Sequence, residues 1–441
     1  MHVAIVGTYP PTRCGIATFT ADVEHALRMN GIDVTIIPVT NCGDEPGPTD
    51  LNGTIWHDDR SSYVRAATYL NELGCDVVLI QHEFGIFGGV AGGHLTAFTQ
   101  ALQVPYALTL HTVLPSFGEP EATNLRSLCA DASVVTVFTS SARRLVLEQG
   151  IAAARQLQII PHGAPAELYT MVDAAAVRRR LLLPETGPLL STFGLLSEGK
   201  GIELAIRALA DIVVDHPTVR YVVAGRTHPG VLRSQGERYR ERLAGLADKL
   251  GLREHVVFLN EFLGIREVAD LLAITDVFCT PYRGEDQIVS GALTFALAAK
   301  CPVVSTPYRY AQDMLADGAG ILVASHDVNG FADALRRLLA TGPERQAAVR
   351  AATNASKSLR WSTVGETIST VLADAISTNV PSRQLTPSLE YSGADSTSAF
   401  HRYPNARHAS ARRASVETRL PVAAPSDGGR PWSIRDRLQT S

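Results

Sequence analysis

The chain has few cysteines, and they are not spaced as metal ligands or redox pairs would be. Its 441 residues include six cysteines, with no Cys-x-x-Cys pair and no histidine partner nearby. Structural zinc sites need closely spaced cysteine and histidine ligands, and disulfide-stapled proteins need a much denser cysteine framework. We therefore expect reduced, structural cysteines, a cytoplasmic location and no zinc centre.

The chain also lacks an excess of positive charge. Lys and Arg number 40 against 44 Asp and Glu, which gives a formal net charge of -4. Proteins that bind the phosphate backbone of nucleic acids usually carry a basic face or stripe. We therefore expect no nucleic-acid partner.

Long apolar runs are missing as well. No apolar stretch approaches the roughly 20 residues that a transmembrane helix needs. The first predicted strand begins almost at the N-terminus, which leaves no space for the charged and apolar regions of a signal peptide. Any membrane contact is expected to be peripheral.

Short apolar stretches alternate with helical stretches along most of the chain. Continuous Val, Ile and Leu strands separated by helices are typical of a parallel sheet that is covered on both faces. A chain of 441 residues exceeds what one core usually serves. We therefore predict an α/β fold of two facing, Rossmann-like, doubly wound domains. The expected strands are 3–7, 34–39, 76–81, 106–111, 134–139 and 158–161, then 189–194, 220–224, 256–259, 277–280, 303–305 and 320–323.

Three segments are expected along the chain. Residues 1–168 form the first domain, which a C-terminal helix over 361–377 joins, and residues 169–360 form the second. The long polar stretch 231–250 of the second domain is predicted as helical. Residues 378–441 are rich in Ser, Pro and Arg and lack any strand or helix pattern, so they predict a disordered tail.

Both halves open with the same arrangement of an apolar strand, a glycine-bearing loop and a helix start. In the first half the loop runs from Gly7 to Gly15, and in the second it runs from Gly194 to Gly201. Free backbone N–H groups and the helix dipole make such a start an anion site. Lys200 lies in the second loop, where its ammonium can bond a phosphate, although an isolated lysine before a helix is more often solvated.

Polar residues follow several predicted strands, at the edge where open parallel sheets bind ligands. Four histidines stand at these strand ends. Each could line a ligand site, or it could have the purely structural role of bonding a neighbouring backbone carbonyl. They are His82, His111, His162 and His228. Ser290 and Gly291 precede an apolar helix and fit an N-cap that leaves backbone N–H groups free for a diphosphate.

Over about residues 1–375 the chain resembles the retaining nucleotide-sugar glycosyltransferases of the GT-B fold, in the glycogen synthase-like and mannosyltransferase-like family. The motifs that carry the resemblance are Pro10–Gly15, Gln81–Gly85, His111–Thr112, Ile160–Gly163, Gly194–Gly201, Ala224–Gly225 and Pro302–Ser305. The resemblance implies that the second domain holds the nucleotide-sugar donor and that the first holds the acceptor.

The resemblance also implies roles for single residues. It makes His111, Lys200 and Glu285 the catalytic candidates. The donor-binding candidates are Gly15, Gly194, Arg226, Gln287, Ser290 and Gly291, and those for the acceptor or sugar pocket are Arg13, His82, Glu83 and His162.

The chain departs from the family pattern at the donor loop. Gln287 and Phe295 stand where most relatives have two glutamates, and Leu195 to Ser197 replace the arginine that usually precedes the lysine. The loop thus resembles a subgroup built on Gln-x-x-Ser-Gly. Arg13, Arg226 or Arg283 could supply the missing positive charge.

The expected reaction transfers a hexose from a nucleoside diphosphate to a hydroxyl acceptor with retention of the anomeric configuration. In the family the leaving phosphate takes the acceptor proton, so no covalent nucleophile is needed. No Asp-x-Asp motif stands at a strand end, so we expect no metal ion and no cofactor beyond the sugar nucleotide. The acceptor could be a saccharide, a polyol or a lipid-linked sugar.

Other functions fit the same architecture. A sugar-nucleotide epimerase would need no acceptor, a phosphorylase would need inorganic phosphate, and a degenerate transferase would only bind the sugar nucleotide. A dinucleotide oxidoreductase is disfavoured because no Gly-x-Gly-x-x-Gly motif follows either opening strand.

Overall fold

The computed structural model describes residues 1–12, 14–41 and 53–378. The predicted disordered tail therefore lies outside the described residues, except for Thr378 at the end of the last helix. Arg13 lies outside them as well. Among the described residues, no helix is long and apolar enough to cross a membrane.

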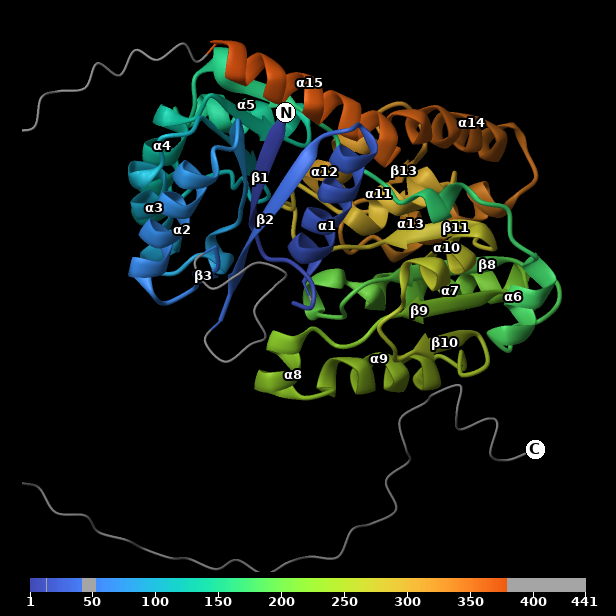
Figure 1. Ribbon diagram of the computed structural model, residues 1–441. Coiled ribbons are helices and arrows are strands. Elements are labelled where there is room, and N and C mark those ends of the chain that lie inside the picture. The colour runs from blue at the N-terminus through green and yellow to red at the C-terminus, as the bar shows by residue number, and fades with distance from the viewer. Residues whose placement is uncertain (13, 42–52, 379–441) are drawn as a thin grey trace, which may run out of the picture. The chain divides into compact units, whose positions relative to one another are not determined.

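The first half of the chain folds into a parallel seven-stranded sheet with the strand order β3-β2-β1-β4-β5-β6-β7. Figure 1 labels β1, β2 and β3 of this sheet. Its elements are β1 (His2–Gly7), α1 (Gly15–Met29), β2 (Asp33–Thr40), β3 (Ile55–Trp56), α2 (Arg60–Leu73), β4 (Val77–His82), α3 (Leu95–Ala101), β5 (Tyr106–Leu110), α4 (Glu119–Asp131), β6 (Val134–Val137), α5 (Ser140–Glu148) and β7 (Leu157–Ile159). The central strands are buried along their whole length, as expected for a sheet with helices on both faces.

The second half forms a parallel six-stranded sheet with the order β10-β9-β8-β11-β12-β13. Its elements are α6 (Ala174–Arg180), β8 (Leu189–Phe193), α7 (Ile202–Asp215), β9 (Arg220–Ala224), α8 (Pro229–Gln235), α9 (Arg238–Lys249), β10 (Val256–Leu259), α10 (Ile265–Ala273), β11 (Val277–Thr280), α11 (Gly291–Ala298), β12 (Val303–Ser305), α12 (Arg309–Met314), β13 (Gly320–Leu322), α13 (Val328–Leu339) and α14 (Pro343–Ser358).

Helix α7 illustrates why the helices form where they do. Its buried residues include Ile202, Ala205, Ile206 and Leu209, which recur three and four positions apart. This spacing places them on one face, and that face packs on the sheet core.

The predicted α/β fold with two doubly wound sheets is confirmed, and every predicted strand is present within one or two residues of its expected ends. The two-residue strand β3 was not predicted, because it is too short for an alternation pattern. The stretch 231–250 is not one helix. Gly236, with φ +64°, separates α8 from α9, because a glycine adopts this backbone conformation without a steric penalty.

The last helix, α15 (Trp361–Thr378), returns to the first half of the chain and packs along α1 (Figure 1). The indole Nε1 of Trp361 donates a hydrogen bond of 3.1 Å to Oδ2 of Asp22 on α1. A Cβ on Gly365 would lie 2.9 Å from the Cβ of Ala26, so glycine permits this close approach. The helix predicted over 361–377 is thus present, whereas the domain boundaries at 168 and 360 stay predictions.

Candidate active site

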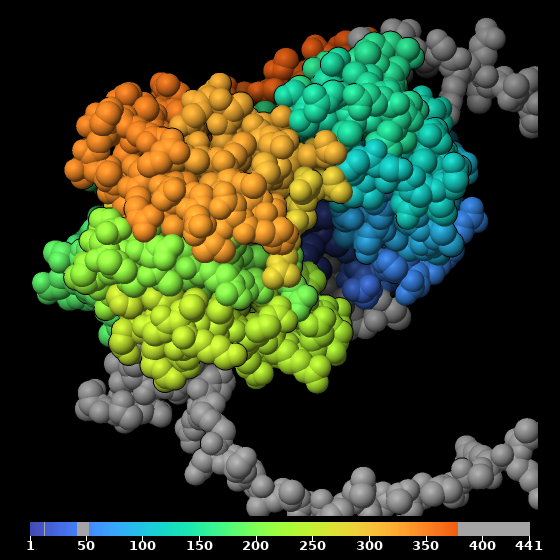
Figure 2. All heavy atoms as spheres, turned by 180° about the vertical axis from the view of Figure 1, so that it is seen from behind, coloured from blue at the N-terminus to red at the C-terminus, as the bar shows by residue number. Residues whose placement is uncertain are grey.

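A cavity of about 1030 Å³ is lined by residues from both halves of the chain. Figure 2 shows the surface hollowed where atoms of the first half, in blue, meet those of the second half, in yellow. In each sheet the lining comes from loops that follow the strands and from the starts of the helices α1 and α11. This is the edge at which parallel sheets place their ligand sites.

The N-terminus of α1 contributes the first wall. Gly15 is its first residue, and a Cβ there would meet no atom within 4 Å, so the backbone is open to a ligand. Cys14 caps the helix, since its Sγ accepts from the amide of Ala17 at 3.4 Å. The unpaired N–H groups of this first turn carry the positive end of the helix dipole.

His111 directly follows β5 and lines the same cavity. Its Nε2 lies 2.9 Å from Oε1 of Gln81, on the neighbouring strand β4. An amide oxygen can only accept, so Nε2 carries the proton and Nδ1 is left as an acceptor. Burial, reinforced by His162 and His82, lowers the pKa of His111 to about 3, so the ring is neutral at physiological pH.

His162 also lines the cavity, and it faces the second half of the chain. Its Nδ1 donates to the carbonyl of Gly163 at 2.7 Å. A Cβ on Gly291 would lie 3.6 Å from its Nε2, so the ring lies beside the N-terminus of α11. Burial lowers the pKa of His162 to about 4 and keeps this ring neutral too.

Of the other two described residues predicted for the acceptor side, Glu83 and His82, only Glu83 lines the cavity. Glu83 lines the cavity and accepts a hydrogen bond from the hydroxyl of Thr112. His82 does not line the cavity. It is fully buried against Phe84 and Phe87, and neither ring nitrogen has a hydrogen-bond partner among the described residues.

The loop after β8 is held against the loop after β9 by backbone hydrogen bonds. The amide of Leu196 donates to the carbonyl of Arg226 at 2.8 Å, and the amide of His228 donates to the carbonyl of Leu196 at 2.9 Å. A Cβ on Gly225 would lie 2.0 Å from the carbonyl oxygen of Gly194, so this close packing requires glycine.

Both loops line a second cavity, of about 280 Å³, together with Cys14 and Gly15 of the first half. Gly194, Leu195 and Arg226 belong to its wall, and the half-exposed ring of Phe262 completes it. Arg226 is the single Lys or Arg among the described residues that line this cavity or the larger one.

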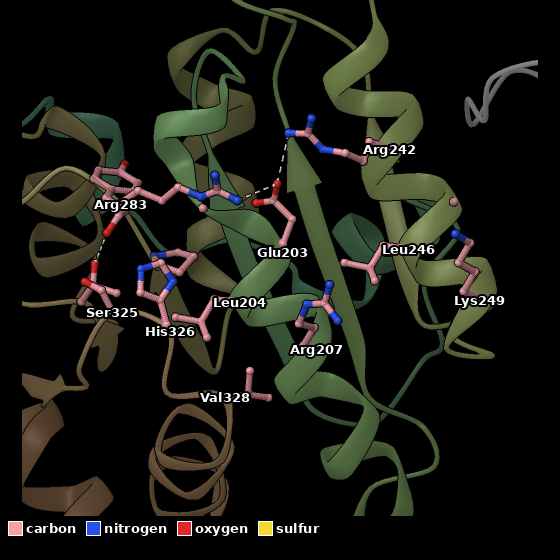
Figure 3. A pocket seen from close by; sticks show the side chains of 15 residues that line it. Glu203, Leu204, Arg207, Arg242, Leu246, Lys249, Arg283, Ser325, His326 and Val328 are labelled. Atoms are coloured by element: carbon pink, nitrogen blue, oxygen red, sulfur yellow. Dashed lines mark hydrogen bonds and ion pairs between the residues drawn. The ribbon is translucent and has the colours of Figure 1, made fainter.

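Lys200 lines neither of these two cavities. Its Nζ is 4.0 Å from the centre of the Tyr282 ring, a cation–π contact. Arg283, one of the three arginines that could replace the missing one, pairs instead with Glu203 at 3.1 Å and lines a different pocket (Figure 3).

Only some of the residues predicted in the donor loop before α11 line a cavity. Gln287 and Gly291 line the larger cavity, and the Nε2 of Gln287 donates to the carbonyl of Val289 at 2.9 Å. The predicted N-cap is present, because Oγ of Ser290 accepts from the amide of Leu293 at 3.3 Å. Glu285 is exposed and does not line either cavity.

Sequence reasoning missed several residues of the cavity wall. Asp22 on α1 lines it, and burial raises the pKa of this carboxyl group to about 7, although the bond from Trp361 acts in the opposite direction. Phe193 and Phe295 lie stacked in the wall with their ring centres 6.1 Å apart. The apolar residue at position 295 could have indicated an apolar part of the wall from the sequence. No motif near Asp22 indicates that this residue lines the cavity.

Comparison with known proteins relates this geometry to a family. Residues 173–355 match the family described as "Glycosyl transferases group 1". A D-inositol 3-phosphate glycosyltransferase from Corynebacterium aurimucosum is 27% identical over 82% of this chain and 84% of its own length. Its counterpart from Acidothermus cellulolyticus is 30% identical over 63% of this chain and 64% of its own.

Solved structures share the fold. Sucrose-phosphate synthase from Thermosynechococcus elongatus superposes with a TM-score of 0.69 at 17% identity, over 86% of this chain and all of that one. HepE from Anabaena in complex with UDP superposes with a TM-score of 0.66 at 18% identity, over 85% of this chain and all of that one.

Proposed function

Because the chain is a GT-B glycosyltransferase with a group 1 domain, we propose that it moves a hexose from a nucleoside diphosphate to a hydroxyl acceptor, with retention of configuration. The observation that carries this proposal is the shared cavity. His111 and Gly15 of the first half line it together with Gln287 and Gly291 of the second. A donor bound at the second half would thus present its sugar to an acceptor held by the first.

In the proposed reaction the departing diphosphate gains negative charge in the transition state. The N-termini of α1 and α11 offer backbone N–H groups to it, and Arg226 offers the permanent positive charge in the wall. Preorganised donors of this kind can supply the largest single contribution to catalysis. Lys200 is the second proposed cation, and it reaches the diphosphate by leaving the Tyr282 ring.

His111 positions the sugar in this proposal. It is neutral, its Nε2–H is engaged by Gln81, and its free Nδ1 can accept a hydrogen bond from a sugar hydroxyl. The leaving phosphate takes the acceptor proton, so the C–O bond to the acceptor forms on the face from which the phosphate departs.

We further propose that the acceptor carries no phosphate. The described lining of the larger cavity contains no Lys or Arg and three carboxyl groups, those of Glu83, Asp286 and Asp22, the last only partly ionised at neutral pH because burial raises its pKa to about 7. His111 and His162, whose pKa values burial lowers to about 3 and about 4, add no positive charge at neutral pH. Two like charges roughly 5 Å apart repel by about 3 kcal/mol at an effective dielectric constant of 20. The donor diphosphate is compensated in this proposal by the N-termini of α1 and α11 and by Arg226, whereas the phosphate of an acceptor would have no such partner. A phosphorylated acceptor, as in the names of the inositol phosphate relatives, is therefore disfavoured here.

The test follows the release of nucleoside diphosphate from UDP-, GDP- and ADP-hexoses with matched acceptor pairs. Suitable pairs are inositol and D-inositol 3-phosphate, glucose and glucose 6-phosphate, and fructose and fructose 6-phosphate. We expect release that depends on the acceptor, an α-linked product from an α-linked donor by NMR, and kcat/KM at least roughly tenfold higher for the neutral member of the productive pair.

The outcomes separate the two proposals. Release that is independent of any acceptor, or no release with any donor, argues against sugar transfer. Preferred use of a phosphorylated acceptor leaves the transfer reaction standing but contradicts the assignment of the acceptor class.

A further inference from the structure

A third pocket lies in the second half of the chain and shares no lining residue with the two cavities of the candidate active site. It encloses about 570 Å³ between α7, α9 and the loops that follow β11, β12 and β13 (Figure 3). Small-molecule sites commonly occupy about 300–1,000 Å³. The pocket is therefore large enough for a metabolite.

Its walls carry a surplus of positive charge. Arg207, Arg242, Lys249 and Arg283 line it, against one carboxylate, Glu203. Arg242 and Arg283 extend toward that carboxylate from either side, at 3.4 Å and 3.1 Å (Figure 3). Arg242 also pairs with Glu198 at 2.8 Å.

Two cations of the pocket remain unpaired. Arg207 stands one helical turn beyond Glu203 on α7, and Lys249 ends α9. Neither has a hydrogen-bond or ion-pair partner within the part of the chain that the structure describes. Their positive charge is thus available to an anion.

The loop after β13 supplies a second kind of observation. The Oγ of Ser325 is buried and has no hydrogen-bond partner among the described residues. The next residue, His326, has φ +80°, a left-handed conformation that is uncommon for residues other than glycine. Unsatisfied polar groups and strained residues are both enriched at ligand sites.

Apolar side chains complete the lining. Leu204, Leu246 and Val328 come from α7, α9 and α13 (Figure 3). A ligand that fits this lining has a negatively charged group and an uncharged body. We propose that the pocket binds a small phosphorylated metabolite, whose phosphate is held by Arg207 and Lys249 and whose body lies on these apolar side chains. This site is separate from the proposed transfer reaction and does not depend on it.

Calorimetric titration of the full chain tests the proposal. The probes are pyrophosphate, glucose 6-phosphate, 3-phosphoglycerate and AMP, each titrated at low ionic strength in the presence of excess UDP to occupy a nucleotide site in the cleft. We expect at least one probe to bind with a Kd below about 1 mM.

Matched variants assign the site. The double variant Arg207→Gln/Lys249→Gln removes both unpaired charges and should weaken binding at least roughly fivefold, because it removes charge-assisted hydrogen bonds. Arg155→Gln/Arg179→Gln removes two exposed charges elsewhere and should leave binding unchanged. Lys249→Glu, which reverses an exposed charge, should also weaken binding and provides a second test if the double variant folds poorly.

The proposal is overturned if no probe binds, or if Lys249→Glu and any folded double pocket variant weaken binding less than roughly fivefold. It is also overturned if the control variant loses as much affinity as the pocket variants, since binding would then reflect net charge alone.

Discussion

Gln81 and His111 are joined by a hydrogen bond of 2.9 Å between Oε1 and Nε2, across the ends of the adjacent strands β4 and β5. The bond fixes both the ring orientation and the tautomer of His111. The Nε2 of Gln81 is buried and has no partner among the described residues, so the amide is retained at a cost in stability. We therefore predict that Gln81 positions His111 for the proposed reaction and is not needed for the stability of the fold.

Replacing Gln81 by methionine therefore separates activity from stability. Gln81→Met removes the bond that orients His111, and it also removes the unsatisfied buried N–H. We expect kcat to fall roughly tenfold while the free energy of unfolding changes by less than about 1 kcal/mol. Steady-state kinetics and urea unfolding of the same preparation check both values, and a normal kcat would contradict the positioning role.

Stability should fall on acidification. Burial lowers the pKa of His82 and His162 to about 4 and that of His111 to about 3, against about 6.5 in the unfolded chain. Between about pH 6.5 and 4 the unfolded chain therefore binds more protons, and each histidine contributes stability that is complete above pH 6.5 and is lost as the pH falls. The slope is up to about 1.4 kcal/mol per pH unit for each ring.

Asp22 acts in the opposite direction over the same range. Its pKa is raised to about 7, so the folded chain holds that proton between about pH 4 and 7, and stability from this group is lost as the pH rises. Three histidines outweigh one carboxyl group. The melting temperature should therefore decrease from pH 6.5 to pH 5, and a constant value would contradict the burial of these rings.

His82→Phe tests one of these contributions alone. The ring packs against Phe84 and Phe87, and its nitrogens have no partner in the described part of the chain, so phenylalanine suits the site. We expect unchanged or higher stability at pH 7 and a shallower loss on acidification. Melting temperatures of the wild type and the variant at pH 7 and at pH 5 measure both effects.

Lys300 offers a test of backbone strain. It follows α11 with φ +64° and an exposed side chain. The left-handed conformation costs roughly 1–2 kcal/mol for residues other than glycine, although glycine loses more entropy on folding. Lys300→Gly should therefore raise the free energy of unfolding by about 1 kcal/mol, whereas Lys300→Ala, which keeps the strain, should not. Equal effects of the two substitutions would contradict this explanation.

Most strands could be predicted from the sequence because both sheets are parallel and their inner strands are buried, so that these strands are largely continuous apolar runs between turn residues. The helix break at Gly236 was missed because helical patterning continues on both sides of it. Strand β3 has only two residues and carries no pattern of its own.

The site was predictable only where it depends on local chain order. Gly15, His111, His162 and Gly291 follow strands or begin helices, and they meet at one cavity. His82 ends its strand as well, but the sequence cannot reveal that aromatic rings enclose it. Asp22 is bonded by Trp361 of α15, more than 300 positions away, and no local motif predicts this hydrogen bond.

Lys200 and His111 belong to opposite halves of the chain, and the central claim is that transfer needs both. The most direct measurement is the acceptor-dependent release of nucleoside diphosphate by the wild type, by Lys200→Ala and by His111→Ala, with circular dichroism to verify folding. The account predicts release by the wild type and at least a roughly tenfold loss of turnover in each folded variant. Turnover near the wild-type value in either folded variant would contradict it.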